Sequence, residues 1–201
     1  MRTYRYLIAA HRIVGICMII GFFSYLLHAH IPFTGTKTIV YTSDALHGQI
    51  GRLRPLDRIP QDTLANGRHI DRMVEDPVYL DLKTIVPFDK ARLSVFYKNE
   101  TPYALSLGVN AAEKGWNIQT KELEIEEGED GWTIGSSEFD LTAVQRRKEV
   151  YQFLISAPGL RYEKHEGSIF ISKIIIHLQR KPVSLSDFAF LAKKFSAKLS
   201  P

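Results

Sequence analysis

Residues 91–98 read ARLSVFYK and residues 168–179 read SIFISKIIIHLQ. In the first stretch Leu93, Val95 and Tyr97 alternate with more polar side chains, which is the pattern of a β-strand with one buried face. The second stretch is apolar at most positions, which is typical of a central strand covered on both sides. Strict alternation assigns one face to Phe170, Ile174, Ile176 and Leu178, and the other to Ile169, Ile171 and Ile175.

Similar short runs occupy most of the chain after Pro77, separated by Gly, Pro, Asn and Asp. This spacing predicts a mostly β protein, an antiparallel β-sandwich of jelly-roll type. The pair Asp130-Gly131 predicts a hairpin turn, because glycine readily accepts a positive φ. The predicted strands are 38–42, 49–53, 78–82, 91–98, 104–109, 117–126, 132–141, 150–156 and 168–179.

Charge and cysteine content exclude two classes of protein. The net charge of +4 arises largely from Arg2, Arg5 and Arg12, which leave 23 basic against 22 acidic residues in the rest of the chain. A nearly neutral body lacks the basic surface that binds nucleic acid, so we expect no nucleic-acid partner. Because Cys17 is the only cysteine, a small domain held together by disulfides is also excluded.

The N-terminal segment is the most apolar part of the chain. Residues 13–27 carry no charge, and extension to residue 31 gives 19 residues, close to the number that crosses a bilayer as a helix. The three arginines precede this span, and no Lys or Arg follows it before Lys37. We therefore expect residues 13–31 to contact the lipid bilayer as a single-pass anchor of the cell membrane, with a cytoplasmic N-terminus and an extracytoplasmic body.

Two alternatives to this anchor remain open. The length of the apolar run also fits a cleavable signal peptide, although the small residues that signal peptidase requires are poorly placed in LLHAH at residues 26–30. A buried core helix is the other alternative. His28 and His30 would lie at the membrane interface, and their spacing does not predict a metal site.

The chain divides into four predicted segments: an anchor at residues 1–31, a stalk with the first edge of the domain at 32–76, the β-sandwich at 77–182, and a helix at 183–201. The last segment places Phe188, Leu191 and Phe195 on one stripe at helical spacing, with lysines mostly outside it. This amphipathic helix would pack on the sandwich, or it would lie on a membrane or a partner.

Signatures of catalysis are missing from the sequence. It contains no G-x-S-x-G, no P-loop, no H-E-x-x-H and no C-x-x-C, so we expect no enzyme, no cofactor and no metal. One constellation favours an enzyme: Glu122, Glu124 and Glu126 alternate in ELEIEE and resemble the E-x-D-x-E strand of jelly-roll glycoside hydrolases. Glu124 replaces the central Asp of that pattern, and a turn follows at once, so a solvated acidic hairpin is the preferred interpretation.

The stretch GVNAAEKGWN at residues 108–117 offers the groups that a non-catalytic sugar site needs. Trp116 could stack on a sugar ring, while Asn117 and Asn110 could bind hydroxyls, so these three are the candidate ligand-binding residues. The alternative is that Trp116 caps the core where the loop meets a strand.

A family resemblance rests on four segments: residues 76–99, the LGVN and GWN motifs with FDLTAV, residues 151–160 (YQFLISAPGL), and residues 168–182. They resemble predicted single-span jelly-roll proteins of candidate-phylum bacteria and, more distantly, galactose-binding-type carbohydrate modules. The resemblance implies a sandwich fold and an envelope location, and it transfers no catalytic residue.

Two functions follow as hypotheses. The first is a membrane-anchored envelope protein whose sandwich binds glycan or another envelope component. The second is a structural or accessory subunit of a membrane-associated assembly. A concave face that includes Trp116 would favour the first hypothesis, and an exposed apolar patch would favour the second.

The predicted orientation is tested by a reporter fused after Pro201 of the full chain. Because the arginines precede the apolar run, we expect an alkaline phosphatase fusion to be active and a cytoplasmic reporter fusion to be inactive. A mature protein that begins near His30 would contradict the anchor and still agree with export.

Overall fold

The computed structural model describes residues 13–21, 24–25, 34–44, 48–63, 69–112, 115–161 and 167–182. The chain separates into two units, one with residues 36–181 and one with residues 1–35 and 182–201. In the second unit, residues 13–21 and 24–25 are helical. No helix within the described ranges is long and apolar enough to cross a membrane. Part of the predicted 13–31 anchor and the predicted helix at 183–201 lie outside the described residues.

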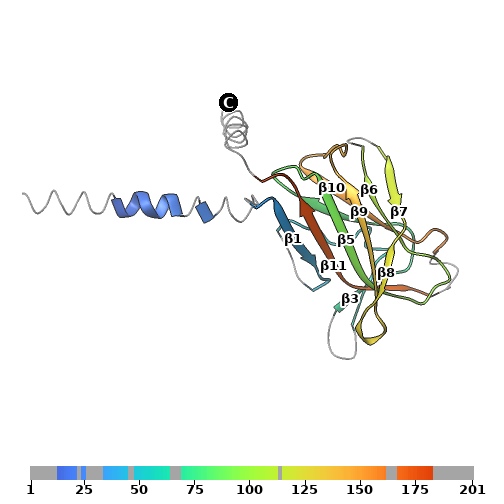
Figure 1. Cartoon of the computed structure of the whole chain (residues 1–201). Coiled ribbons are helices and arrows are strands. Elements are labelled where there is room, and N and C mark those ends of the chain that lie inside the picture. The colour runs from blue at the N-terminus through green and yellow to red at the C-terminus, as the bar shows by residue number, and fades with distance from the viewer. Residues whose placement is uncertain are drawn as a thin grey trace, which may run out of the picture. The chain divides into compact units, whose positions relative to one another are not determined.

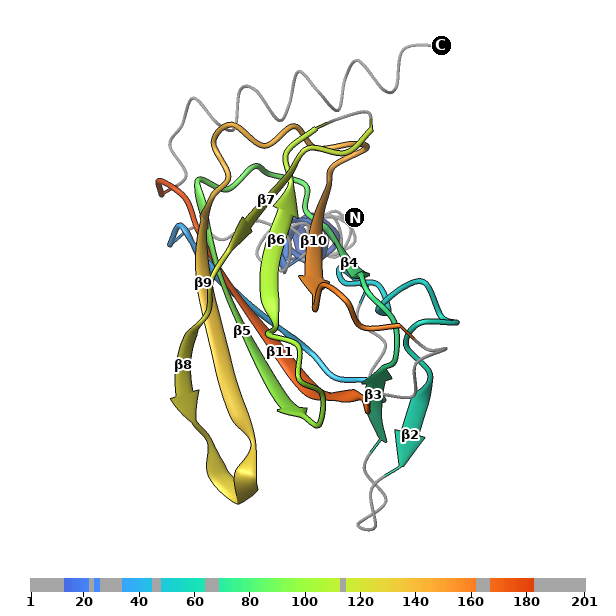
Figure 2. The same ribbon diagram turned by 90° about the vertical axis from the view of Figure 1, so that its right-hand side faces the viewer.

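The unit of residues 36–181 consists of two antiparallel sheets (Figures 1 and 2). This confirms the predicted mostly β, sandwich-like architecture. The seven-stranded sheet contains β2 (Gln61–Thr63), β3 (His69–Met73), β11 (Ile169–Gln179), β5 (Lys90–Asn99), β9 (Thr133–Asp140) and β8 (Glu124–Glu127) in that order, with β1 (Thr36–Tyr41) also paired to β11. The four-stranded sheet contains β4 (Val78–Lys83), β10 (Val150–Ser156), β6 (Ser106–Asn110) and β7 (Ile118–Lys121) in that order.

The centre of the larger sheet is the pairing of β5 with β11, the two stretches whose sequence indicated the fold. The predicted inward face of β5 is confirmed, because Leu93 and Val95 are buried. In β11 the register shifts between Ile171 and Lys173. The face assignment made by strict alternation is therefore wrong. The bulge adds one residue to β11, so that beyond it the side chains point to the opposite face from the one that strict alternation predicts. The side chains that are consequently buried together are Ile169, Ile171, Ile174, Ile176 and Leu178.

The core lies between the two sheets and includes several aromatic rings. Phe139 of β9 and Phe153 of β10 meet across the sandwich, with ring centroids 6.4 Å apart. The Tyr151 hydroxyl accepts a hydrogen bond from the Phe88 amide at 2.9 Å and donates one to the Phe88 carbonyl at 3.3 Å. A buried phenol that both donates and accepts avoids the penalty for an unpaired polar group.

The structure corrects the predicted strand 117–126. It is two strands, β7 in the smaller sheet and β8 in the larger one, so the chain passes from one sheet to the other between residues 121 and 124. At this crossing the Leu123 side chain packs against Gly135. A Cβ added at Gly135 would lie 2.6 Å from Leu123 Cδ1, so the missing side chain leaves room for the leucine. The predicted turn at Asp130 and Gly131 is confirmed, with φ of 55° and 72°.

Two strands, β2 and β3, occur where the polar sequence indicated none. β3 forms because it pairs with β11, a partner that local sequence cannot reveal. The predicted strand at 49–53 is instead a short segment along β4, where the Gly51 amide donates to the Asp81 carbonyl at 2.9 Å. Within residues 32–76, Leu53 and Met73 are buried in the core.

A buried polar pair connects β1 to β3. The Tyr41 hydroxyl donates to Asp71 Oδ2 at 2.7 Å, and Asp71 is 3% exposed. Burial raises the pKa of Asp71 to about 6, and the hydrogen bond from Tyr41 opposes this rise. The folded protein therefore binds a proton at Asp71 more tightly than the unfolded chain, so this residue stabilises the fold less as the pH rises from about 4 to about 6.

Asp71→Asn should remove this pH dependence, because the amide is neutral and its oxygen can still accept from Tyr41. We expect the variant to gain on the order of 2 to 3 kcal/mol of unfolding free energy over the wild type at pH 7, and this gain to disappear below about pH 4. Urea unfolding between pH 3 and 7 measures it. Asp57→Asn, at an exposed aspartate, is the control, and an equal gain at every pH would refute the prediction.

Candidate functional site

The outer face of the four-stranded sheet carries a row of hydrogen-bonded polar side chains. Antiparallel register places Gln152 opposite Asp81, and Gln152 and Asn110 are themselves joined through their side chains. Gln152 Nε2 donates to Asp81 Oδ1 at 3.2 Å, and Asn110 Nδ2 donates to Gln152 Oε1 at 3.3 Å. Arg54 pairs with the other oxygen of Asp81. The row thus extends across three strands of the sheet and orients each amide.

Asn110, the last residue of β6, also holds the loop that follows it. Its side-chain oxygen accepts from the amides of Ala112 at 3.2 Å and Asn117 at 3.1 Å, while its Nδ2 also donates to the Gly115 carbonyl at 3.2 Å. The Ala111 amide closes the base of the loop through a 2.8 Å bond to the Asn117 carbonyl. One amide side chain therefore fixes both ends of the loop that carries Trp116.

Trp116 projects from this loop and is 62% exposed. Its ring lies against Tyr79 of β4, with centroids 5.0 Å apart and the planes tilted by 34°. This exposure argues against Trp116 as a core cap, because most of its surface faces solvent. Burial also raises the pKa of the Tyr79 phenol above its ordinary value. The two rings form an aromatic surface beside the polar row.

These groups line one pocket with a volume of about 630 Å³. This size falls in the range of small-molecule sites, which is about 300 to 1,000 Å³. Besides Trp116 and the polar row, its walls include Gln145, Arg147 and Lys148 from the segment before β10. The Gln145 amide donates to the Ala111 carbonyl at 3.1 Å, which joins the two loops that border the pocket. We refer to it as the Trp116 pocket.

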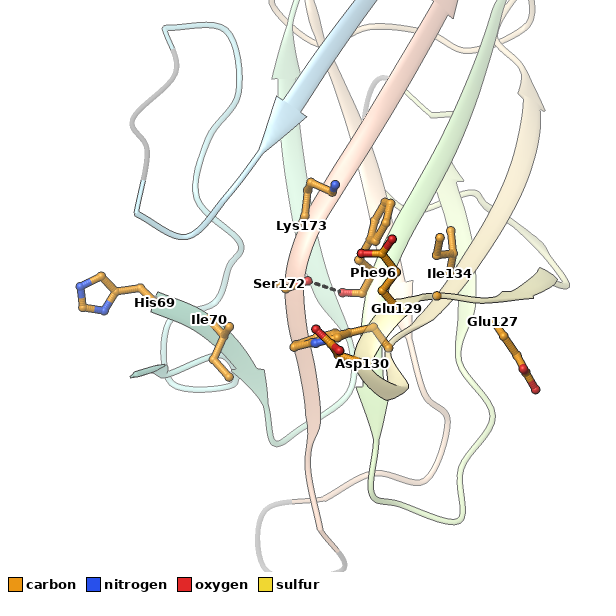
Figure 3. A pocket seen from close by; sticks show the side chains of 11 residues that line it. His69, Ile70, Phe96, Glu127, Glu129, Asp130, Ile134, Ser172 and Lys173 are labelled. Carbon is orange, nitrogen blue, oxygen red and sulfur yellow. Dashed lines mark hydrogen bonds between the residues drawn. The ribbon is translucent and has the colours of Figure 1, made fainter. Parts of the chain in front are cut away.

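A second hollow of about 640 Å³ lies on the larger sheet, between β3 and the β8–β9 hairpin (Figure 3). Its aromatic surfaces are occupied by lysines of the protein itself. Lys173 Nζ lies 3.9 Å from the centre of the Phe96 ring, and Lys98 Nζ lies 5.1 Å from that of Trp132. In Figure 3 the His69 ring points away from the other labelled side chains. This hollow therefore offers no free aromatic face comparable to Trp116.

The glutamates that suggested a hydrolase lie elsewhere. Glu124 and Glu126 belong to β8, at the edge of the larger sheet, and Glu124 pairs with Arg92 at 3.0 Å. None of the three glutamates lines the Trp116 pocket. Among the described residues, no group of three or more His, Cys, Asp or Glu side chains is placed to hold a metal ion. His28 and His30 lie outside those residues.

Of the three predicted ligand-binding residues, the structure brings Trp116 and Asn110 to one pocket. The Asn117 side chain is exposed and does not line it. The sequence did not single out Tyr79, Asp81 and Gln152, although VYLDL and VYQFL place each of them at an outward position between buried residues. That signal marks an exposed side chain in a strand, but it does not show which exposed side chains meet.

No protein-family model and no curated protein sequence matches this chain. Among solved structures, it is similar to the C-terminal CBM6 of LamC, a marine laminarinase from Zobellia galactanivorans, with 12% identity, a TM-score of 0.39, and 70% of this chain and 98% of that chain covered. The CBM22-1 xylan-binding domain of Paenibacillus barcinonensis Xyn10C has 10% identity, a TM-score of 0.45 and coverage of 71% and 94%. CBM35 from Cellvibrio japonicus Abf62 has 12% identity, a TM-score of 0.44 and coverage of 73% and 100%. Because these identities and TM-scores are low, we infer function from the surface of this chain alone.

Asn110→Ala should loosen the loop that carries Trp116. Because the substitution leaves the Ala112 and Asn117 amides without their acceptor, we expect a loss of about 1 to 3 kcal/mol in unfolding free energy. Amide hydrogen exchange at these two positions should accelerate. Asn117→Ala is the matched control, since its side chain makes no hydrogen bond within the described part of the chain. Equal effects of the two variants would contradict the role of Asn110.

Proposed function

We propose that this protein binds a glycan in the Trp116 pocket on the outer face of its four-stranded sheet, and that it is a binding protein rather than an enzyme. The observation that carries the proposal is a tryptophan 62% exposed, whose flanking residues Gly115 and Asn117 are hydrogen-bonded to Asn110, beside a row of oriented amides. Folding gives no reason to leave so large an apolar ring in water, because burial of such a ring is favourable.

The chemistry of the pocket suits a sugar. The apolar face of a pyranose ring can stack on an indole, and its hydroxyls both donate and accept hydrogen bonds. Gln145 and Gln152 provide amide groups in the wall, and Arg54 provides guanidinium donors. Each of these side chains is at least partly exposed. An aromatic surface bordered by amides and a cation fits a polyhydroxylated ring better than a purely apolar ligand.

The alternative is a structural or accessory subunit of a membrane-associated assembly. Such a role would be supported by an exposed apolar patch on the sandwich. The exposed large apolar side chains of the described sandwich are instead Val40 on β1, Leu56 after the short segment along β4, Trp116 in its loop and Ile125 on β8. Val40 and Ile125 lie on strands that β11, β5 and β9 separate in the larger sheet, and Trp116 lies in a loop of the smaller sheet, so these three do not form one patch. Glycan binding is therefore the better-supported function.

The location that we propose is the cell envelope, with residues 13–31 as the membrane anchor and the sandwich outside the cytoplasm. Support comes from the uncharged run at 13–27 and from the three arginines that precede it. We also propose that the sandwich is a jelly roll with a distant resemblance to carbohydrate-binding modules. A pocket for an extracytoplasmic glycan is consistent with this location.

Trp116→Ala tests the proposed function. Loss of one aromatic surface should weaken glycan binding by about 1 to 3 kcal/mol, which corresponds to roughly 5- to 150-fold. The unfolding free energy should change by less than about 1 kcal/mol, because the ring is mostly exposed. Binding is measured with the full-length protein in non-ionic detergent on an array that contains neutral and acidic glycans.

Ile125→Ala is the control, because Ile125 is 65% exposed and lies on β8, in the other sheet. It should bind glycans as the wild type does. If the wild type retains no glycan on the array, glycan binding is refuted, and the assembly subunit becomes the better hypothesis. Turnover of a glycan that Glu122→Gln abolishes would favour the hydrolase instead.

A further inference from the structure

A tight turn before β10 presents two cations to the Trp116 pocket. The Val150 amide donates to the Arg147 carbonyl at 3.1 Å, so residues 147–150 close a two-residue hairpin turn. The central residues Lys148 and Glu149 have φ of 51° and 69°. This left-handed conformation normally selects Gly, Asn or Asp, and other residues adopt it at an energetic cost. A lysine and a glutamate therefore occupy a strained turn at the edge of the pocket.

The cations in the pocket differ in how they are neutralised. Arg54 pairs with Asp81, which is the only carboxylate among the described residues that line the pocket. Arg147 and Lys148 are exposed, and neither side chain makes a hydrogen bond or ion pair with any described residue. The preceding residue, Arg146, is different because its guanidinium donates to the Thr84 carbonyl at 2.9 Å and to the Thr84 hydroxyl at 3.1 Å. The pocket thus carries two positive charges that the described structure does not compensate.

From this arrangement we propose that the Trp116 pocket selects anionic saccharides, in which a carboxylate or sulfate group binds Arg147 and Lys148. The inference rests on the proposed function, since it names the class of glycan that the same pocket takes. The planar guanidinium of Arg147 can bind two oxygens of such a group, and the Lys148 ammonium adds a point charge. Trp116 then stacks on the sugar ring that bears the acid.

Selectivity follows from the two kinds of group in one pocket. A neutral sugar can use the aromatic surface and the amides, but it leaves Arg147 and Lys148 as they are in the free protein. An acidic sugar gains charge-assisted hydrogen bonds, which are roughly twice as strong as neutral ones. The remainder of the body is nearly neutral. Preference for acidic sugars should therefore depend on these two residues rather than on overall charge.

The experiment measures the affinity of full-length protein in non-ionic detergent at 0.15 M salt, a condition that screens long-range attraction. The probes are two polymer series: dextran, carboxymethyl-dextran and dextran sulfate, which share one backbone, and galactan, polygalacturonate and carrageenan, which are built from galactose or its acid. The test variant is Arg147→Gln with Lys148→Asn, because Asn tolerates a left-handed backbone. The control, Lys98→Gln with Lys173→Gln, removes the same charge from the hollow on the larger sheet.

We expect the wild type to bind the acidic members of at least one series at least tenfold more tightly than the neutral member. The test variant should lose this preference, and the control should keep it. Binding of only the carboxylated or only the sulfated polymers identifies which acid the pocket accepts.

Three results would overturn the inference. Equal affinity for neutral and acidic members, with both abolished by Trp116→Ala, would refute the anionic preference and leave glycan binding intact. Equal losses in the test and control variants would show attraction by general charge. No binding to any polymer here or to any glycan of the array would refute the proposed function and this inference together.

Discussion

The bulge in β11 is the constraint on which this fold depends. It allows one strand to keep its apolar side chains in the core on both sides of Ser172, along the full length of its pairing with β5. Without the extra residue, the end of β11 that begins at Ile169 would turn its core side chains toward solvent. β11 also pairs with β1 on one side of the bulge and with β3 on the other side. The bulge therefore sets the positions of Tyr41 in β1 and Asp71 in β3 relative to each other.

The smaller sheet shows how burial of one face determines the chemistry of the other. β4, β10 and β6 bury large side chains such as Leu80, Phe153 and Val109 against the larger sheet. In strands that alternate, this burial leaves Asp81, Gln152 and Asn110 on the outer face. Register then places them in one row, where they are joined by hydrogen bonds. The pocket is thus a consequence of core packing, and the loops determine what surrounds it.

The two hollows illustrate why an aromatic residue does not by itself mark a binding site. In the hollow on the larger sheet, lysines of the protein already lie over Phe96 and Trp132. In the pocket on the smaller sheet, Trp116 leans on Tyr79 and keeps most of its surface in solvent, while Arg147 and Lys148 project from a strained turn. An exposed ring, and two cations that pair with no described residue, do not stabilise the fold, and this is the physical basis for the proposal that they bind a ligand.

Most of the strands could be predicted from the sequence because alternation is a local property. The spacing of Leu93 and Val95 determined the inward face of β5, and Asp130-Gly131 determined a turn, since backbone sterics act over a few residues. Trp116 and Asn110 could also be predicted as candidates, because their residue types suit sugar binding. Only the tertiary structure decided the bulge at Ser172, the division of residues 117–126 between two sheets, the contact of Trp116 with Tyr79, and the presence of Gln152 and Arg147 in the same pocket as Trp116. These features depend on contacts between residues far apart in the chain, and strand register, which no local pattern specifies, brings those residues together.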